Sequence, residues 1–199
     1  MIKPIPALVC VIVVMSALSS LAAQDATPPP GKHGAFKRSV DFDLMASWAY
    51  KETLGLAKPE AKLSYAPMLS YSFLLDETNT LGIVLLKFNH FALAQDPVCT
   101  FGYGFQFKHY WNPAWADLGA YLPWISYGIL LSQAVVANTP GRAIGHNTRM
   151  GLGTDIVLAP AHHLVLQAAW DSVDFPTLGS TASNSLGMMS AGLGYRFLF

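Results

Sequence analysis

The stretch TFGYGFQFKHYW, from Thr100 to Trp111, alternates two kinds of side chain with a period of two. Successive side chains of an extended strand point to opposite sides. One face would carry Phe101, Tyr103, Phe105, Phe107, His109 and Trp111. The other face would carry Thr100, Gly102, Gly104, Gln106, Lys108 and Tyr110. A barrel in water buries its large apolar groups, whereas a barrel in lipid turns them outward and keeps small and polar residues inside. The stretch therefore predicts a strand of a membrane barrel.

The same alternation recurs along the chain, in Val40–Lys51, Lys62–Phe73, His146–Leu158, His163–Val173 and Met189–Phe199. Two further segments, Thr80–Ala94 and Leu118–Val136, are apolar on both faces, and we assign them as strands partly because the count needs them. Strands of roughly 9–11 residues cross the hydrocarbon at a tilt, bacterial barrels have an even strand number, and lipid offers no partner for an open backbone edge. The expected fold is all-β: an eight-stranded antiparallel transmembrane up-and-down β-barrel.

The composition agrees with a membrane protein and excludes some partners. The 199 residues carry zero formal net charge, and 12% are charged while 52% are hydrophobic. The balance of charge argues against a nucleic-acid partner, and the low charged fraction indicates a chain that is membrane-embedded or unusually buried. No segment after the N-terminal region offers 18 uninterrupted apolar residues, so a transmembrane helix does not explain the composition.

The N-terminal region predicts export. Met1–Ala23 combines Lys3, the apolar run Ala7–Leu18 and a small-residue cleavage site, which is typical of a secretory signal peptide; an uncleaved anchor is the alternative. Residues 24–38 form an expected flexible periplasmic leader, and residues 39–199 the barrel. Removal of the signal would leave Cys99 as the only cysteine, with no intramolecular disulfide and no cysteine-rich metal site.

The breaks between the expected strands predict an orientation. Three are short, namely Asp76–Asn79, Asn112–Asp117 and Ala159–His162. The others are mostly longer, namely Glu52–Glu60, Gln95–Val98, Ala137–Gly145 and Pro176–Leu186. Periplasmic turns are short and outer loops long. We expect the outer membrane of a diderm bacterium, with both termini periplasmic and with the last two long breaks as the main external loops.

Charged side chains on the inward faces form two expected groups. A lumenal charge cluster near the periplasmic end contains Asp41, Asp43, Lys108, Asp155 and Arg196. A second group nearer the outer mouth contains Lys62, Arg149 and Asp171. Buried charges persist only when they are paired. The groups could form a gate or filter, or a salt-bridged plug that replaces a hydrophobic core. The plug is favoured because an eight-stranded interior is only just wide enough for its side chains.

The ending MSAGLGYRFLF resembles the C-terminal strand of bacterial outer-membrane barrels, which commonly finish on phenylalanine after alternating aromatics. By this resemblance Tyr195, Phe197 and Phe199 form an assembly signal for the outer-membrane insertion machinery. Met189–Phe197 is especially similar to the outer-membrane protein W family, although Leu198 and Phe199 follow its closing run. The resemblance implies an eight-stranded barrel associated with uptake of small, often hydrophobic molecules by a narrow, partly lateral route.

Signals of catalysis and metal binding are weak. Some outer-membrane lipid A deacylases display a histidine and a serine two residues apart, followed by asparagine. Here His109-Tyr110-Trp111-Asn112 places Trp111 at the nucleophile position, and tryptophan cannot attack an ester. His109 and Trp111 are better explained as part of an interfacial aromatic belt. His162 and His163 would point apart in a strand, so no catalytic residue, metal or cofactor is expected.

Three functions remain open from the sequence. The first is a narrow channel that passes small, hydrophobic solutes. The second is a structural or surface-interaction protein of the adhesin type, and the third is an enzyme that acts on lipid A. The expected partners are outer-membrane lipids, the insertion machinery and a small hydrophobic solute.

Overall fold

A computed structural model gives the fold and describes residues 38–52, 63–76, 78–91, 98–111, 121–136, 142–178 and 181–199. The signal peptide Met1–Ala23 and the leader up to residue 37 lie outside these ranges. The strands are β1 (Arg38–Glu52), β2 (Leu63–Leu74), β3 (Asn79–Phe91), β4 (Val98–Tyr110), β5 (Tyr121–Val136), β6 (Arg142–Ala159), β7 (His162–Leu178) and β8 (Thr181–Leu198). Within these ranges, no helix is long and apolar enough to cross a membrane.

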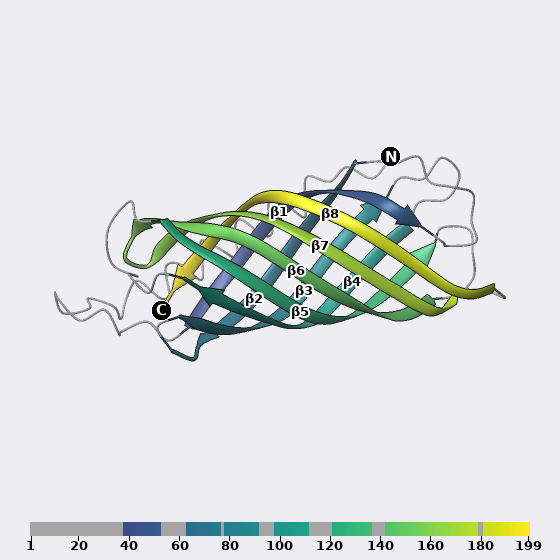
Figure 1. The fold of residues 1–199 in the computed structure, drawn as a ribbon, viewed down its shortest axis with the longest axis horizontal. Helices are drawn as coiled ribbons and strands as arrows, with labels where there is room; N and C mark the ends of the chain where they lie inside the picture. Colours follow the sequence, from purple (N-terminus) through teal and green to yellow (C-terminus); the bar gives the residue numbers. More distant parts are fainter. Residues whose placement is uncertain are drawn as a thin grey trace, which may run out of the picture.

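The eight strands form one closed barrel in which every strand pairs antiparallel with its neighbours in sequence and β1 also pairs with β8 (Figure 1). This confirms the predicted fold class. It also confirms the two weak assignments, β3 and β5. The barrel begins at Arg38, one residue before the predicted boundary. We call the end where β1 starts and β8 finishes the terminal end, and the opposite end the far end.

The closing seam joins the first strand to the last residue of the chain. The Phe199 amide donates to the Arg38 carbonyl at 3.0 Å, and the Arg38 amide donates to the Phe199 carbonyl at 3.2 Å. Along the seam Asp41 lies directly opposite Arg196. The aromatic C-terminal residue is thus paired into the sheet rather than frayed.

The far end differs from the prediction because the last strands are longer than expected. Pro176–Leu186 was expected to be an external loop, but β7 continues to Leu178 and β8 begins at Thr181. Cross-strand pairing persists there, with Phe175 opposite Asn184 and Thr177 opposite Ala182. Likewise β6 begins at Arg142, inside the expected loop Ala137–Gly145. Ser, Thr and Asn suggested turns, but neighbouring strands extended the ladder through them and overrode local preference.

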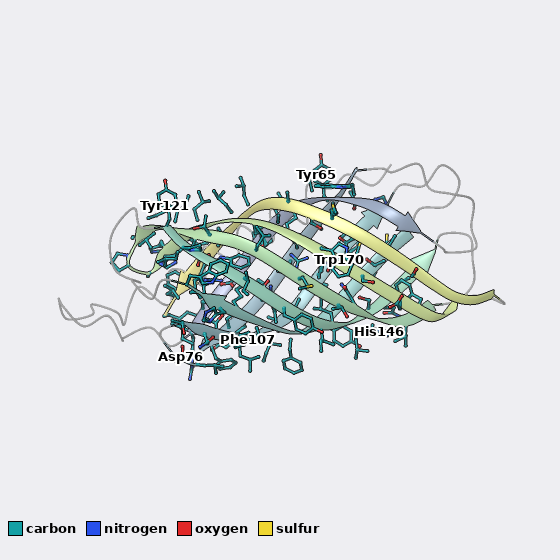
Figure 2. The ribbon with its side chains drawn as sticks, viewed as in Figure 1. Tyr65, Asp76, Phe107, Tyr121, His146 and Trp170 are labelled. Atoms are coloured by element: carbon teal, nitrogen blue, oxygen red, sulfur yellow. The ribbon has the colours of Figure 1, made fainter. Side chains whose placement is uncertain are left out.

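The inversion of apolar and polar faces is present in the structure. In β4, Phe105 is 60% exposed, whereas Gln106 and Lys108 are each 3% exposed. Tyr65 and Tyr121 project from the wall in Figure 2. In β5 most inward side chains are apolar too, since Leu122, Trp124, Leu130 and Ala134 are at most 1% exposed, while Tyr127 faces outward. This double apolarity explains why the sequence of β5 shows no clear alternation.

Three apolar clusters fill much of the interior. One lies toward the far end and contains Ala49, Ala134, Val173, Phe175, Leu186 and Met188. A second contains Met45, Ala66, Met68, Val84 and Leu130. The third contains Tyr110, Leu122, Trp124, Val157 and Val165. All of these side chains are at most 8% exposed, so the lumen is a packed core.

Packing around Trp124 generates a test. A Cβ added at Gly153 would clash with the Leu166 carbonyl oxygen and lie 2.6 Å from Trp124 Cζ2, whereas one added at Gly102 would meet its nearest atom at 3.5 Å. We predict that Gly153→Ala lowers the free energy of unfolding by about 1–3 kcal/mol, the usual range for overpacking, and that Gly102→Ala has a smaller effect. Urea unfolding in lipid vesicles measures both. Equal effects would contradict the close packing of Gly153 against Trp124 and the Leu166 backbone.

Candidate functional site: the lumenal ion clusters

The first ion cluster consists of Asp41, Lys108, Asp155 and Arg196, and it crosses the interior near the terminal end. Arg196 Nε donates to Asp41 Oδ1 at 2.8 Å and Nη2 donates to Oδ2 at 2.7 Å. Lys108 Nζ donates to the same Oδ2 at 3.1 Å. This bidentate contact between guanidinium and carboxylate is the strongest form of a hydrogen-bonded ion pair. Strands β1, β4 and β8 are therefore tied together through one carboxylate.

Asp155 of β6 extends this cluster across the lumen. Its carboxylate contacts Arg196 Nη1, which also contacts the Tyr110 hydroxyl. The Tyr110 hydroxyl donates to Asp155 Oδ2 at 3.1 Å, and Trp124 Nε1 donates to Oδ1 at 2.8 Å. His163 Nδ1 lies 3.6 Å from Oδ2. Lys108 Nζ lies 4.8 Å from the centre of the Trp124 ring, within range of a cation–π interaction.

Asp43, the fifth predicted member, lies beside the first ion cluster but outside its hydrogen-bond network. It is fully buried, and its carboxylate occupies the space that a Cβ at Gly194 would need. Within the part of the chain that the structure describes, this carboxylate forms no hydrogen bond of ordinary geometry. The groups that face it include Lys108, Asp41 and Gln167. The structure thus brings four predicted residues into one bonded network and places the fifth next to it.

The second ion cluster consists of Lys87, Arg149 and Asp171. Lys87 Nζ lies 2.5 Å from Asp171 Oδ1, and Arg149 Nη1 lies 2.8 Å from Oδ2. Asn147 Nδ2 donates to Asp171 Oδ1 at 3.1 Å. The prediction that Arg149 and Asp171 share a site is consistent with these contacts. Lys62, the third predicted member, lies outside the described residues.

Lys87 was missed because β3 breaks its own alternation. Pairing shifts register between Val84 and Lys87, so that Leu85 and Leu86 both face outward, at 54% and 46% exposure. Lys87 is then turned inward and is 1% exposed. Unbroken alternation from Val84 would have placed this lysine on the lipid side, where a charge is costly. That conflict was the signal in the sequence for a β-bulge.

Both ion clusters have the properties of fixed cross-braces, that is, of buried ion pairs that link different strands across the lumen. Their charged side chains are almost fully buried, with exposures of 0% to 4%. Each carboxylate is shared by more than one cation or hydrogen-bond donor, which is how buried charges become tolerable. Since the partners come from different strands, the clusters connect opposite parts of the wall. They can hold the wall together and leave little room for water.

The remaining predicted residues lie on the outer wall at the terminal end. The rings of His162 and Phe197 are 5.2 Å apart, and those of Phe197 and Phe199 are 6.0 Å apart. Tyr195 contacts His162 through its hydroxyl. His163 points inward and His162 outward, as adjacent strand residues do. These aromatics would suit a membrane interface, while their role as an assembly signal stays a prediction.

Comparisons with known proteins identify the fold of this chain but do not assign it to a family. Neisserial surface protein A matches with a TM-score of 0.62 and 11% identity, over 81% of this chain and 97% of that one. The N-terminal β-barrel domain of OprF from Pseudomonas aeruginosa matches with a TM-score of 0.51 and 14% identity, over 82% and 99%. Neither a family model nor a curated protein matches the chain. At these identities the likeness shows the eight-stranded barrel fold alone.

Removal of Arg196, the central cation of the first ion cluster, should lower the free energy of unfolding. Arg196→Ala would leave Asp41 and Asp155 buried with too few partners, and breaking a buried pair costs about 3–5 kcal/mol. We expect a loss of this size in the free energy of unfolding. Arg38→Ala serves as the control, because Arg38 is exposed at the start of β1. Urea unfolding of the two variants measures the difference, and an Arg196→Ala barrel as stable as the control would contradict the cross-brace.

Proposed function

We propose that this protein is a closed outer-membrane barrel that acts as a structural or surface-interaction protein rather than as a channel through its lumen. The observation that supports this most directly is the filled interior. Large side chains that include Trp124, Arg149 and Arg196 are less than 2% exposed inside the barrel. Together with the two ion clusters and the three apolar clusters, they occupy the interior along the described strands. A solute could pass only if these braces separated.

The first expectation from the sequence, a narrow channel for small hydrophobic solutes, gains less support. The outer-membrane protein W resemblance that suggested it rests on the last strand alone, and it too stays a prediction. A filled lumen would leave only a lateral route through the wall. Each strand pairs with both of its neighbours, but the pairing between β2 and β3 ends at Met68 and Lys87, so within the described strands the far-end part of β2 before Met68 has no ladder partner in β3. The interior is better suited to stability than to transport.

The far end supports a role at the surface. Toward the far end the outward faces of β6 and β7 include the polar residues His146 and Asp174, and the apolar Ile144 lies beyond His146. These two side chains are 63% and 51% exposed, and His146 Nε2 lies 3.5 Å from Asp174 Oδ2. A sheet that extends beyond the apolar band would stand in water. We infer that the far end faces the exterior and that both termini face the periplasm.

Enzymatic activity is not part of the proposal. His109 Nδ1 is engaged by Asn79 Oδ1 at 2.9 Å. Trp111, at the position of a deacylase nucleophile, is 59% exposed and has no nucleophilic atom. Treatment of lipid A with the purified barrel should therefore leave its acyl chains intact.

Electrical recording tests the closed lumen. We predict that the refolded protein gives no stepwise conductance in planar bilayers, and no uptake of small apolar solutes by liposomes, because the interior side chains leave no continuous path. A porin with an open lumen provides the positive control. Reproducible conductance steps or solute uptake from this barrel would overturn the proposal and restore the channel.

Surface labelling tests the orientation. In a Cys99→Ser background, His146→Cys at the far end should react with a membrane-impermeant maleimide on intact cells. Thr78→Cys, in the turn between β2 and β3 at the terminal end, should react only after the outer membrane is permeabilised. Asp76, which belongs to the same turn as Thr78, and His146 lie toward opposite ends of the barrel in Figure 2. The reverse pattern would place the termini at the cell surface.

A further inference from the structure

The seam between β2 and β3 is paired over only part of its length. Its ladder ends at Met68 and Lys87. Beyond that point β2 stays paired with β1 as far as Leu63, and β3 stays paired with β4 as far as Phe91. We call this outer part the unpaired seam; it comprises residues 63–67 of β2 and 88–91 of β3.

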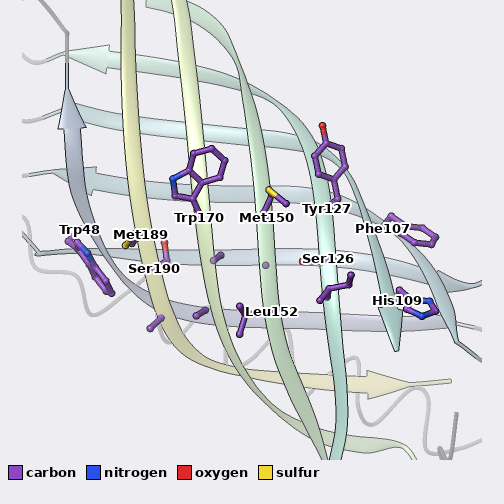
Figure 3. A pocket seen from close by; sticks show the side chains of 15 residues that line it. Trp48, Phe107, His109, Ser126, Tyr127, Met150, Leu152, Trp170, Met189 and Ser190 are labelled. Carbon is purple, nitrogen blue, oxygen red and sulfur yellow. The ribbon is translucent and has the colours of Figure 1, made fainter. Parts of the chain in front are cut away.

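On the other side of β2 the wall is continuous at the same level. Outward side chains that lie opposite one another in successive ladders form a row through Tyr127, Met150, Trp170, Met189 and Trp48 (Figure 3). This row reaches β2 at Leu63, the ladder partner of Trp48. Within the described strands it has no continuation into β3. Pairing around the barrel therefore stops, at this level, at the unpaired seam.

A proline explains why the ladder stops. Both the amide and the carbonyl of His90 point to β2, because both bond to the Ser64 hydroxyl. Residues of an antiparallel strand turn their backbone groups alternately to one neighbour and the other, so those of Phe88 point to β2 as well. Continuing the register one residue beyond the last pair would place Pro67 opposite Phe88. Proline has no N–H to donate, so this pair can make one of its two hydrogen bonds at most.

At the next such position a side chain replaces the backbone. The Ser64 hydroxyl accepts a hydrogen bond from the His90 amide at 3.0 Å and donates one to the His90 carbonyl, with the two oxygens 2.5 Å apart. The Tyr65 carbonyl, at 3.3 Å, is a longer alternative acceptor. One hydroxyl can serve both His90 groups because it is a donor and an acceptor. It satisfies the two groups that Tyr65, the register partner of His90, would bond in a continued ladder.

We propose that Ser64 is a latch that closes the barrel wall where the strand ladder is interrupted, and that loss of its hydroxyl opens the unpaired seam. Ser64 is 1% exposed, so water does not compete for its hydrogen bonds. Hydrocarbon offers no substitute partner for a backbone amide or carbonyl. Without the hydroxyl, the His90 groups can be satisfied only by water, and water can reach them only if β2 and β3 separate.

The latch separates the interior from the surroundings of the barrel. Ala66 and Met68 lie on the inward face beside the unpaired seam, and both belong to an apolar cluster that is at most 1% exposed. On the outward face Tyr65 is 66% exposed, and an aromatic residue suits the membrane interface. The inference goes beyond the proposed function, which concerns passage along the lumen. Bilayer conductance reports on the lumen and the measurements below report on the wall, so each can fail without the other.

Amide hydrogen exchange, measured by NMR on the refolded barrel in detergent, tests the latch. Ser64→Ala should make the His90 amide exchange at least about tenfold faster, because two hydrogen bonds across the seam are lost. Ser64→Thr keeps a hydroxyl and should stay close to the wild type. Ser70→Ala is the matched control, since Ser70 is also buried on the inward face of β2 but lies opposite Val84 within the ladder.

Thiol labelling tests whether the seam then opens. In a Cys99→Ser background, the thiol introduced by Ala66→Cys should resist N-ethylmaleimide while Ser64 is present, and should react about tenfold faster after Ser64→Ala, in line with the exchange at His90. Each variant is first shown to fold by its heat-modifiable migration on gels. If Ser64→Ala does not fold, Ser64→Cys replaces it in the exchange measurement, because a thiol is a weak donor and acceptor. Unchanged exchange at His90 would overturn the proposal, and so would an introduced thiol that stays unreactive once the hydroxyl is gone.

Discussion

The structure depends on one constraint: a sheet placed in hydrocarbon has no water to satisfy its edges, so every backbone amide and carbonyl must find a partner in the sheet. Here the constraint is met by the seam between β1 and β8, which ends with Phe199 paired to Arg38. Once the sheet is closed, alternate side chains must face either the exterior or a narrow interior. The outward aromatics of β4 and the inward Gln106 and Lys108 are consequences of that closure.

The narrow interior then determines what its side chains can be. Eight strands leave space for side chains and little else, so the charges of Asp41, Arg196 and Asp171 are stable only because partners from other strands reach them. Apolar groups such as Trp124 fill the remaining volume. An interior built in this way braces the wall, and it shifts the expected points of contact with other molecules to the far end and to the outer surface.

Much of the fold could be predicted because period-two alternation is a local property of the sequence. The same pattern grouped Asp41, Lys108, Asp155 and Arg196, since inward position and depth follow from counting residues. It failed at Lys87, where a bulge exchanges the two faces, and at Trp124, where both faces are apolar. It also failed at Pro176–Leu186, because pairing with a neighbouring strand decides whether Ser and Thr form a loop. The outward row of Phe107, Tyr127, Met150, Trp170, Met189 and Trp48 depends on which residues lie opposite one another across six strands, and no single segment reveals that register.

The most direct test of the inverted arrangement is nuclear cross-relaxation between acyl-chain protons and selectively labelled methyl groups of β5 in lipid bilayers. Leu130 and Leu131 are adjacent, yet one is 1% exposed inside the barrel and the other 50% exposed outside. The account predicts strong cross-relaxation from acyl chains to Leu131 and none to Leu130. Equal contact of both methyl groups with lipid, or contact of Leu131 with water alone, would contradict it.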